Sequence, residues 1–317
     1  MRDLLQNSCF AVCIFTILLL LFTSCDDDSQ NVGNGPKLDD PRGIAVEFDG
    51  NLVVADRGLL AVVRIDVTNG NRSILSGEGI GTGAAFVDPR GIDVLNDGSI
   101  VVADAGANTL VKIDSENGNR TILSGEGVGM GAALMEPRDL ALEADGNIVV
   151  KDRGLETILG VDSDTGDRVI ISGQGVGGGP PFITPRGIAV LSDGDIAIAD
   201  IGQVAILHVN IITGDHSFLS NAGTGTGPLF EAPTQIAIED DGNLLVTDSN
   251  LAAVFRIDEE SGDRMILSDA GTGSGPRFRR PVGDHLDFDG NLVVTDNERD
   301  AVIRVDAETG DRTLITE

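Results

Sequence analysis

The sequence predicts an all-β fold, a six-bladed β-propeller of four-stranded antiparallel blades with a 48-residue repeat. The first observation is a proline-led segment that recurs at a constant spacing of 48 residues, without insertion or deletion. The second is that each repeat holds four short apolar runs, and the third is that glycine-containing turn signals separate these runs. One such unit cannot bury its apolar surface alone, so neighbouring copies must stack. The repeats begin at Pro41, Pro89, Pro137, Pro185, Pro233 and Pro281.

The first repeat shows the expected strands in order. Its apolar runs cover 43–48, 51–56, 61–67 and 71–76 and are rich in Val, Ile and Leu, which favour strands. The pairs Asp49-Gly50 and Asn69-Gly70 predict two-residue hairpin turns, so the unit is an antiparallel meander. Several runs are apolar on both faces, as expected for sheets that pack against neighbours on both sides, and six such sheets close into a ring around a channel.

Two other repeat architectures fit less well. The coils of a parallel β-helix are shorter and do not carry two hairpin turns each, and an open solenoid needs polar capping repeats. Residues 316–317 align with 76–77, so each blade is expected to be contiguous in sequence. Closure should then rest on packing of blade 1 against blade 6. We assign 41–317 to the propeller.

The N-terminus predicts an envelope location. Residues 1–25 combine Arg2 with an apolar run that is short for a membrane span. The run ends in a segment that resembles the lipobox of bacterial lipoproteins, with Ser24 before Cys25. This resemblance implies lipidation of Cys25 and stable membrane anchoring, with the outer membrane or cell surface as the expected location. Residues 26–40 read as an acidic, flexible tether.

The composition narrows the range of partners. The formal net charge is −29 and the chain contains no Trp or Tyr. Excess negative charge disfavours nucleic acid and anionic membrane surfaces, and missing aromatic platforms disfavour base-stacking sites. We expect a monomer that binds a protein partner or a small-molecule ligand on the top face, where the crossovers between blades meet the second loop of each blade.

Two repeated positions map to that face. The first is an aspartate in every blade, which we expect to cap loops through backbone N–H groups: Asp56, Asp104, Asp152, Asp200, Asp248 and Asp296. The second is an arginine in four blades, replaced by Thr234 and Val282 in the others: Arg42, Arg90, Arg138 and Arg186. These arginines form salt bridges with the ring aspartates or, alternatively, a cationic mouth that binds an anionic ligand.

Departures from the repeat give further candidates. In blade 6, Asp284 and His285 stand where blade 1 has Ile and Ala, and we place both on the inner strand near the mouth. In blade 3, Asp139 replaces a glycine and Lys151 an alanine, while Gln235 marks blade 5. An Asp at an apolar position needs a partner, so these changes indicate either a site or drift of the repeat. His208 and His216 replace arginines of outer strands and read as surface substitutions.

Two loop motifs give weaker evidence about function. The glycine-rich segment 77–83 is not a phosphate-binding loop, because neither a helix nor a Gly-Lys-Ser/Thr follows it. Residues 162–167 imitate a calcium loop without its distal glutamate and are more simply a turn between strands. We assign no cofactor, and we keep Ca²⁺ binding as an alternative because the chain is strongly acidic.

The segments 41–46 (PRGIAV) and 50–56 (GNLVVAD) resemble the blades of NHL-type propellers, and the resemblance extends to all six units. It implies the propeller fold but not one activity, because related propellers include lyases, lactonases and binding modules. Streptogramin-lyase-like enzymes need a catalytic histidine, for which His285 is the candidate. Gluconolactonase-like enzymes hold a channel calcium, which Asp284, Asp139 and the aspartate ring could imitate only in part. Three scattered histidines cannot supply the histidine-ligated metal of the amidating lyases.

The sequence therefore favours a lipid-anchored, extracytoplasmic propeller that binds a partner or ligand on its top face without catalysis. The alternative is a lyase or lactonase-like hydrolase with a channel-mouth site around His285 and Asp284, with or without a divalent metal.

The lipobox gives a first testable expectation. Changing Cys25 to Ser removes the thioether to lipid, so the protein should leave the membrane fraction for the soluble fraction when cells are fractionated. Membrane association that survives the change would contradict the assignment of Cys25 as the anchor.

Overall fold

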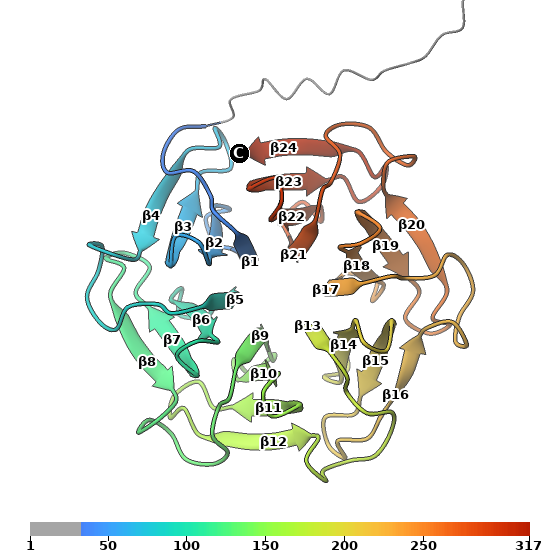
Figure 1. Cartoon of the computed structure of the whole chain (residues 1–317), viewed down its shortest axis with the longest axis horizontal. Helices are drawn as coiled ribbons and strands as arrows, with labels where there is room; N and C mark the ends of the chain where they lie inside the picture. The colour runs from blue at the N-terminus through green and yellow to red at the C-terminus, as the bar shows by residue number, and fades with distance from the viewer. Residues whose placement is uncertain (1–32) are drawn as a thin grey trace, which may run out of the picture. The chain divides into compact units, whose positions relative to one another are not determined.

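A computed structural model describes residues 33–317 and confirms the predicted six-bladed β-propeller (Figure 1). The predicted signal segment with Cys25, and the tether before residue 33, lie outside the described residues. Within 33–317 there is no helix that could span a membrane.

Each blade consists of four consecutive strands, ordered from the channel outward. Blade 1 holds β1 (Pro41–Val46), β2 (Leu52–Asp56), β3 (Ala61–Ile65) and β4 (Arg72–Ser76); blade 2 holds β5 (Pro89–Val94), β6 (Ile100–Asp104), β7 (Thr109–Ile113) and β8 (Arg120–Ser124). Blade 3 holds β9 (Pro137–Leu142), β10 (Ile148–Asp152), β11 (Thr157–Val161) and β12 (Arg168–Ser172); blade 4 holds β13 (Pro185–Val190), β14 (Ile196–Asp200), β15 (Ala205–Val209) and β16 (His216–Ser220). Blade 5 holds β17 (Pro233–Ile238), β18 (Leu244–Asp248), β19 (Ala253–Ile257) and β20 (Arg264–Ser268); blade 6 holds β21 (Pro281–Leu286), β22 (Leu292–Asp296), β23 (Ala301–Val305) and β24 (Arg312–Thr316).

The second strand of each blade is buried along its whole length, from Leu52–Asp56 in blade 1 to Leu292–Asp296 in blade 6. Both of its faces are covered because a neighbouring blade packs on each side, which explains its nearly continuous apolar sequence. The apolar clusters accordingly span pairs of blades. One of them joins Ala45 and Val53 of blade 1 to Ile92 and Ile100 of blade 2.

The predicted two-residue hairpin turns are wrong. In the first turn Glu47 and Asn51 close the hairpin, since Glu47 N donates to Asn51 O at 2.8 Å, and the loop holds three residues. Gly50 occupies its last position at φ 87°, the left-handed conformation that closes a type I turn with a bulge. The second turn spans four residues between Asp66 and Asn71, with Gly70 at φ 71°. Asp-Gly and Asn-Gly mark a left-handed glycine equally well in these longer loops.

The propeller begins earlier than predicted. Asn34 N donates to Asn71 Oδ1 at 2.7 Å, Arg72 Nε donates to Pro36 O at 2.7 Å, and Leu38 is buried. Residues 34–40 thus cover blade 1 as the later crossovers cover their own blades. The flexible tether predicted for 26–40 does not include this packed segment.

The ring aspartates are structural, as predicted. Asp104 is fully buried and accepts hydrogen bonds from Val87 N and Asp88 N, both at 2.8 Å, and from Ala107 N at 3.1 Å. One carboxylate therefore fixes both the crossover into its blade and the loop between the second and third strands. These are the two segments that form the top face.

A second repeated contact joins neighbouring blades at the rim. Arg120 on β8 donates from Nη1 to Ser76 Oγ of the preceding blade at 2.6 Å and from Nε to Ala84 O at 2.7 Å. In blade 4 the position is His216, whose ring lies 4.6 Å from that of Phe182 and whose Nδ1 lies 3.2 Å from Ser172 Oγ. Its prediction as a surface substitution is wrong, because this position clamps adjacent blades together.

The same contacts close the ring between the last blade and the first. Arg72 donates to Thr316 Oγ1, and Thr316 Oγ1 donates to Gly70 O at 2.8 Å. Near the channel, Thr295 Oγ1 donates to Arg42 O at 2.5 Å. No blade borrows a strand from the other end of the described chain, so the predicted closure by packing is confirmed.

Removing a ring carboxylate should lower stability. In Asp104→Ala three backbone N–H groups lose a fully buried acceptor, and we expect the free energy of unfolding to fall by about 2 kcal/mol, measured by urea denaturation. Asp114→Ala is the matched control, because Asp114 also accepts backbone N–H groups but in an exposed turn. Equal losses in both variants would contradict the role assigned to the buried ring.

Candidate ligand-binding site at the channel mouth

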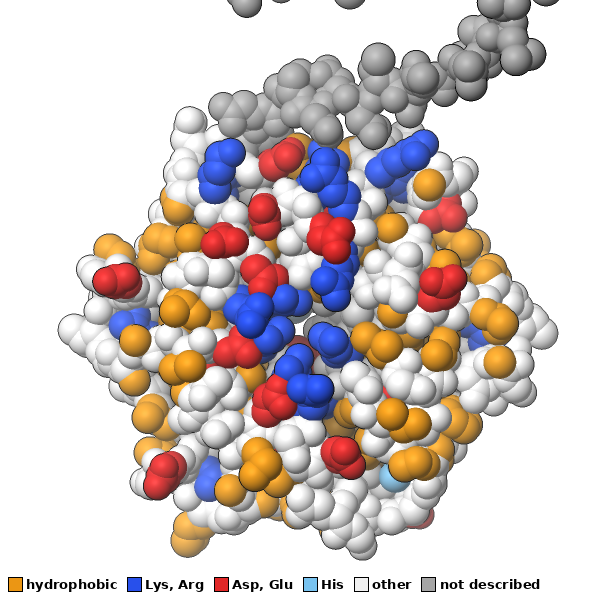
Figure 2. Space-filling model, viewed as in Figure 1, with side chains coloured by type: hydrophobic (Ala, Val, Ile, Leu, Met, Phe, Trp, Pro, Cys, Tyr) orange, Lys and Arg blue, Asp and Glu red, His pale blue; other side chains and the backbone are white. Residues whose placement is uncertain are grey.

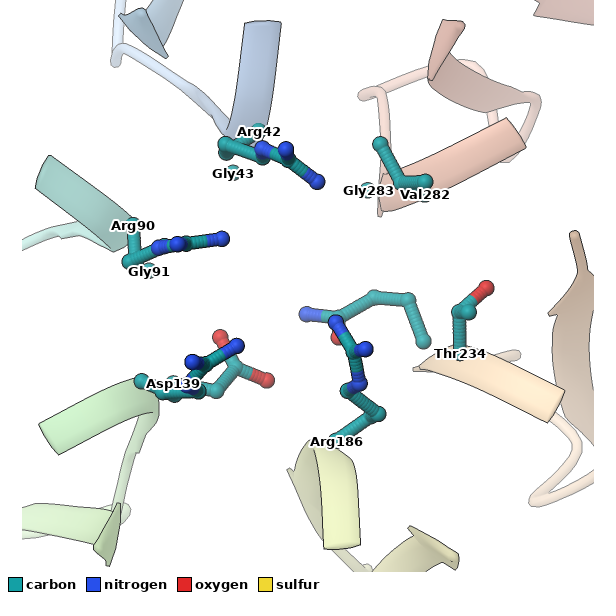
Figure 3. Close-up of a pocket in the computed structure, with 11 residues that line it drawn as sticks. Arg42, Gly43, Arg90, Gly91, Asp139, Arg186, Thr234, Val282 and Gly283 are labelled. Carbon is teal, nitrogen blue, oxygen red and sulfur yellow. The ribbon is translucent and has the colours of Figure 1, made fainter. Parts of the chain in front are cut away.

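The innermost strands bring the four predicted arginines to the mouth of the channel. Arg42, Arg90, Arg138 and Arg186 follow the first prolines of β1, β5, β9 and β13, where a β-bulge interrupts pairing with the next strand. Figure 2 shows Lys and Arg side chains gathered at the centre of this face. In Figure 3 the side chains of Arg42, Arg90 and Arg186 point toward the axis. We call the cavity that they line the arginine pocket.

The arginine pocket is small and has a polar floor. It has a volume of about 60 Å³, enough for a few water molecules or one small anionic group. Asp139 of β9 and Gln235 of β17 line it together with Thr234, Val282 and glycines. A Cβ atom on Gly91 would come within 2.7 Å of Asp139 Oδ1, and one on Gly187 within 2.6 Å of Gln235 Oε1. Glycine at these positions therefore leaves room for the two side chains that fill the channel here.

The arginines pair with acids other than the ring aspartates. Arg42 lies 2.7 Å from Asp40, Arg90 lies 2.8 Å from Asp88, and Arg138 binds Glu136. Each acid stands two residues before its arginine, so the predicted pairing with the ring aspartates is wrong. The ring carboxylates are occupied by backbone N–H groups instead.

Arg186 breaks this pattern. Thr184 occupies the position of the acid in blade 4, and Arg186 has no ion pair among residues 33–317. Its buried Nε lacks a hydrogen-bond partner in that range, as does Nε of Arg42, so the missing acid is what distinguishes Arg186. Burial, followed by repulsion from Arg138, Arg90 and Arg42, lowers the pKa of Arg186 to about 10. The guanidinium remains charged near neutral pH and is the member of the quartet that lacks a counter-ion.

Two further arginines raise the positive charge of the mouth. Arg57 bridges Asp40 and Asp88, at 3.0 Å from each, and Arg153 lies 2.9 Å from Glu136. Five of the six arginines thus share three carboxylates, and Arg186 pairs with none of them. The arrangement suits an anionic ligand because guanidinium groups present paired donors to carboxylate or phosphate oxygens.

Lys151 lies beneath the surface of the mouth. It is fully buried on β10, in register with Asp139, and its Nζ has no hydrogen-bond partner within the described part of the chain. Burial, reinforced by Arg138, lowers the pKa of Lys151 to about 7, whereas burial raises the pKa of Asp139 to about 7. Asp139 Oδ2 accepts a hydrogen bond from Ile188 N at 2.9 Å. Lys151 is fully buried and does not line the arginine pocket, so a ligand in that pocket would not contact it directly.

Asp284 and His285 do not form a common site. Successive residues of β21 point to opposite sides, and neither residue is among those that line the arginine pocket. Asp284 is buried, neither carboxylate oxygen has a hydrogen-bond partner among the described residues, and burial raises the pKa of Asp284 well above its usual value. Thr247 of the neighbouring blade offsets this rise only in part.

His285 has a partner that the sequence reasoning missed. Its Nε2 lies 3.9 Å from Asp93 Oδ1, its Nδ1 lies 2.7 Å from Leu286 O, and its side chain is 37% exposed. Asp93 and His285 occupy one repeat position on β5 and β21, which flank β1 in the ring. The other blades carry alanine there, so the same comparison that singled out His285 could have identified Asp93: Ala45, Ala141, Ala189 and Ala237.

The described residues also include one acidic group that contains a histidine. Ligand atoms of Asp193, Asp195 and His208 lie within 4.8 Å of one another on blade 4. His208 Nε2 is 3.1 Å from Asp195 Oδ2, so a direct contact between two side chains of blade 4 accounts for much of the geometry. In the predicted calcium-like loop, Asp162 Oδ1 accepts the N–H groups of Asp164 and Thr165, as a turn aspartate does.

Comparison with known proteins finds the same fold in other proteins but does not identify the site. The sequence matches no protein-family model and no curated protein. Among solved structures, virginiamycin B lyase from Staphylococcus aureus has a TM-score of 0.62 and 15% sequence identity, covering 91% of this chain and 86% of that one. A gluconolactonase from Xanthomonas campestris has a TM-score of 0.64 and 17% identity, covering 82% and 84%. The nidogen/laminin complex has a TM-score of 0.63 and 15% identity, covering 82% and 91%.

At these identities the similarity shows the fold alone. The chain is a six-bladed β-propeller whose fold is similar to these two enzymes and to the nidogen/laminin structure, as the resemblance of its repeats implies. Proteins of different function share the architecture, so the function must be argued from the residues of this chain.

Asp284 gives a prediction with a pH signature. The folded state keeps Asp284 protonated above the pKa of about 3.9 that the unfolded chain has, so stability from this group falls as pH rises above that value. Asp284→Ile restores the residue type of the other blades and removes this penalty. The variant should unfold at higher urea concentration than the unaltered protein at pH 7, with a smaller gain at pH 4. A variant less stable at pH 7 would contradict it.

Proposed function

We propose that the protein is a binding module whose arginine pocket holds the anionic group of a ligand without catalysis. The observation that carries the proposal is Arg186, a half-buried cation at the channel mouth whose place in the repeat lacks the acid that pairs with the other three arginines. A buried charge is costly without a counter-charge, so a bound anion would complete the pattern.

The size of the arginine pocket defines what enters it. A cavity of about 60 Å³ accepts a carboxylate or a phosphate but not a whole metabolite of ordinary size. The remainder of a larger ligand must then lie on the top face. Asp139 and Gln235 fill the channel below, so the ligand would approach from the top face.

The envelope location belongs to the same proposal and rests on the sequence. A lipid on Cys25, followed by an acidic segment, would hold the propeller at the membrane with its top face open to a partner or a small ligand. Because the chain carries a net charge of −29, an anionic ligand would bind only where arginines outnumber acids, and the arginine pocket is such a place.

The hydrolase or lyase alternative has less support in the geometry. Its two named residues point away from each other, and Asp284 is buried. His285 remains accessible enough to act alone, so the alternative predicts that His285→Ala abolishes an activity while leaving anion binding at the arginine pocket unchanged.

The proposal is tested with simple anions. Acetate and inorganic phosphate are titrated into purified protein carrying Cys25→Ser, and binding is followed by calorimetry at low salt. Arg186→Gln should weaken binding of at least one anion by roughly 10- to 100-fold, as expected for loss of a charge-assisted pair. Arg186→Lys should lose less, because it keeps the charge without the planar fork.

Arg277→Gln is the matched control, since it removes one exposed positive charge outside the arginine pocket. If neither anion binds, or if the Arg186 and Arg277 variants bind equally well, the arginine pocket is not an anion site.

A further inference from the structure

The top face of blade 4 is uncharged around Arg186. Blades 1 and 3 place Arg57 and Arg153 at the start of the loop after their second strand, where blade 4 has Ile201. The acid that precedes the arginine in blades 1–3 is Thr184 here. Arg186 therefore stands alone, whereas the other three arginines belong to a network of alternating charges.

Ile201 replaces the arginine of blades 1 and 3, and two exposed apolar side chains lie beside it on the same face. Ile183, on the crossover into blade 4, is 53% exposed, and Val204, in the loop after β14, is 39% exposed. Figure 2 shows hydrophobic side chains on this face between the central arginines and the rim, over blades 4 and 5. We call Ile183, Ile201 and Val204 the blade 4 apolar strip.

The blade 4 apolar strip is held rigidly beside Arg186. Asp200 accepts hydrogen bonds from Ile183 N at 2.8 Å and Thr184 N at 2.9 Å, and Ile201 N donates to Thr184 O at 3.1 Å. Val204 adopts φ 51°, a conformation that β-branched residues avoid, where blade 2 has Asn108 at φ 57°. Val204 is thus a β-branched residue in an unfavourable backbone conformation, and its apolar side chain is exposed to solvent.

Charge sets the direction in which a ligand can extend from the arginine pocket. Toward blades 1–3 it would meet the paired acids Asp40, Asp88 and Glu136. Toward blades 5 and 6 it would pass Thr234 and Val282 and then meet exposed Glu231 or Arg280. Toward blade 4 it meets only uncharged and apolar groups on the residues named above.

We propose that the ligand is an amphiphilic carboxylic acid, with its carboxylate at Arg186 and its apolar chain along the blade 4 apolar strip. This inference rests on the proposed function. Carboxylate chemistry suits the small cavity and the lone guanidinium, and an apolar chain that covers an uncharged surface buries apolar area without desolvating a charged group.

Chain-length dependence tests the inference. Acetate, butanoate, hexanoate and octanoate are titrated at equal salt concentration into protein carrying Cys25→Ser, so that no attached lipid competes. Each methylene group that becomes fully buried should strengthen binding by up to roughly fourfold. We expect octanoate to bind at least tenfold more tightly than acetate. Octanol and octylammonium, which lack the anionic group, should bind more weakly than octanoate.

Two variants separate the head from the chain. Ile183→Asn combined with Val204→Asn should flatten the chain-length dependence while leaving acetate binding within about twofold; asparagine tolerates the left-handed conformation at 204, so the fold should persist. Arg186→Gln should weaken every member of the series.

The outcomes distinguish the two proposals. If acetate binds through Arg186 but octanoate binds no more tightly, the arginine pocket stands and the amphiphilic ligand is refuted. If octanoate binds more tightly but the double asparagine variant changes nothing, the chain lies elsewhere and the inference also fails. If no carboxylate binds, this inference fails, and phosphate binding decides the proposed function.

Discussion

The architecture depends on a clamp between the outermost strand of each blade and the blade before it. In five blades an arginine donates to a hydroxyl group and to a crossover carbonyl of the preceding unit, and its guanidinium lies over Phe86, Phe230 or Phe278 in three of them. His216 keeps the stacking with a smaller ring. Because each blade buries both faces of its second strand against neighbours, any loosening at the rim would expose apolar strands. These contacts hold in the ring the blades whose inner strands line the arginine pocket.

The clamps also help to explain which arginines are available to bind a ligand. Most arginines of the described chain are committed, either to clamps or to ion pairs with acids two residues away, so a guanidinium without such a commitment stands out. Arg186 is of this kind because the repeat supplies the arginine of blade 4 but not its acid. Lys151 and Asp284 also have polar atoms without hydrogen-bond partners among the described residues. Both side chains are buried, so they affect the stability of the fold rather than the shape of the site. Comparing blades position by position therefore separates candidate binding groups from strained core groups.

Much of the fold could be predicted from the sequence, because the repeat fixes the phase of every strand. The expected strands of blade 1 differ from the observed ones by two residues at most, as at 43–48 against Pro41–Val46. The capping role of the ring aspartates also followed from the pattern. The orientation of inner-strand side chains did not, because the bulge after Pro41 inserts one residue and changes which positions face the channel. That shift places Asp139 in the floor of the arginine pocket and Asp284 between two blades.

The way the ring closes has a consequence for chain connectivity. The two ends of the described chain meet at one turn, since Asn34 bonds to Asn71 and Thr316 bonds to Gly70. No strand is exchanged between the ends, so the junction of blades 6 and 1 resembles every other junction. Circular permutation, with the old ends joined and new ones opened in any crossover, would preserve every blade intact. The contacts of the closed ring therefore do not depend on which blade is synthesised first.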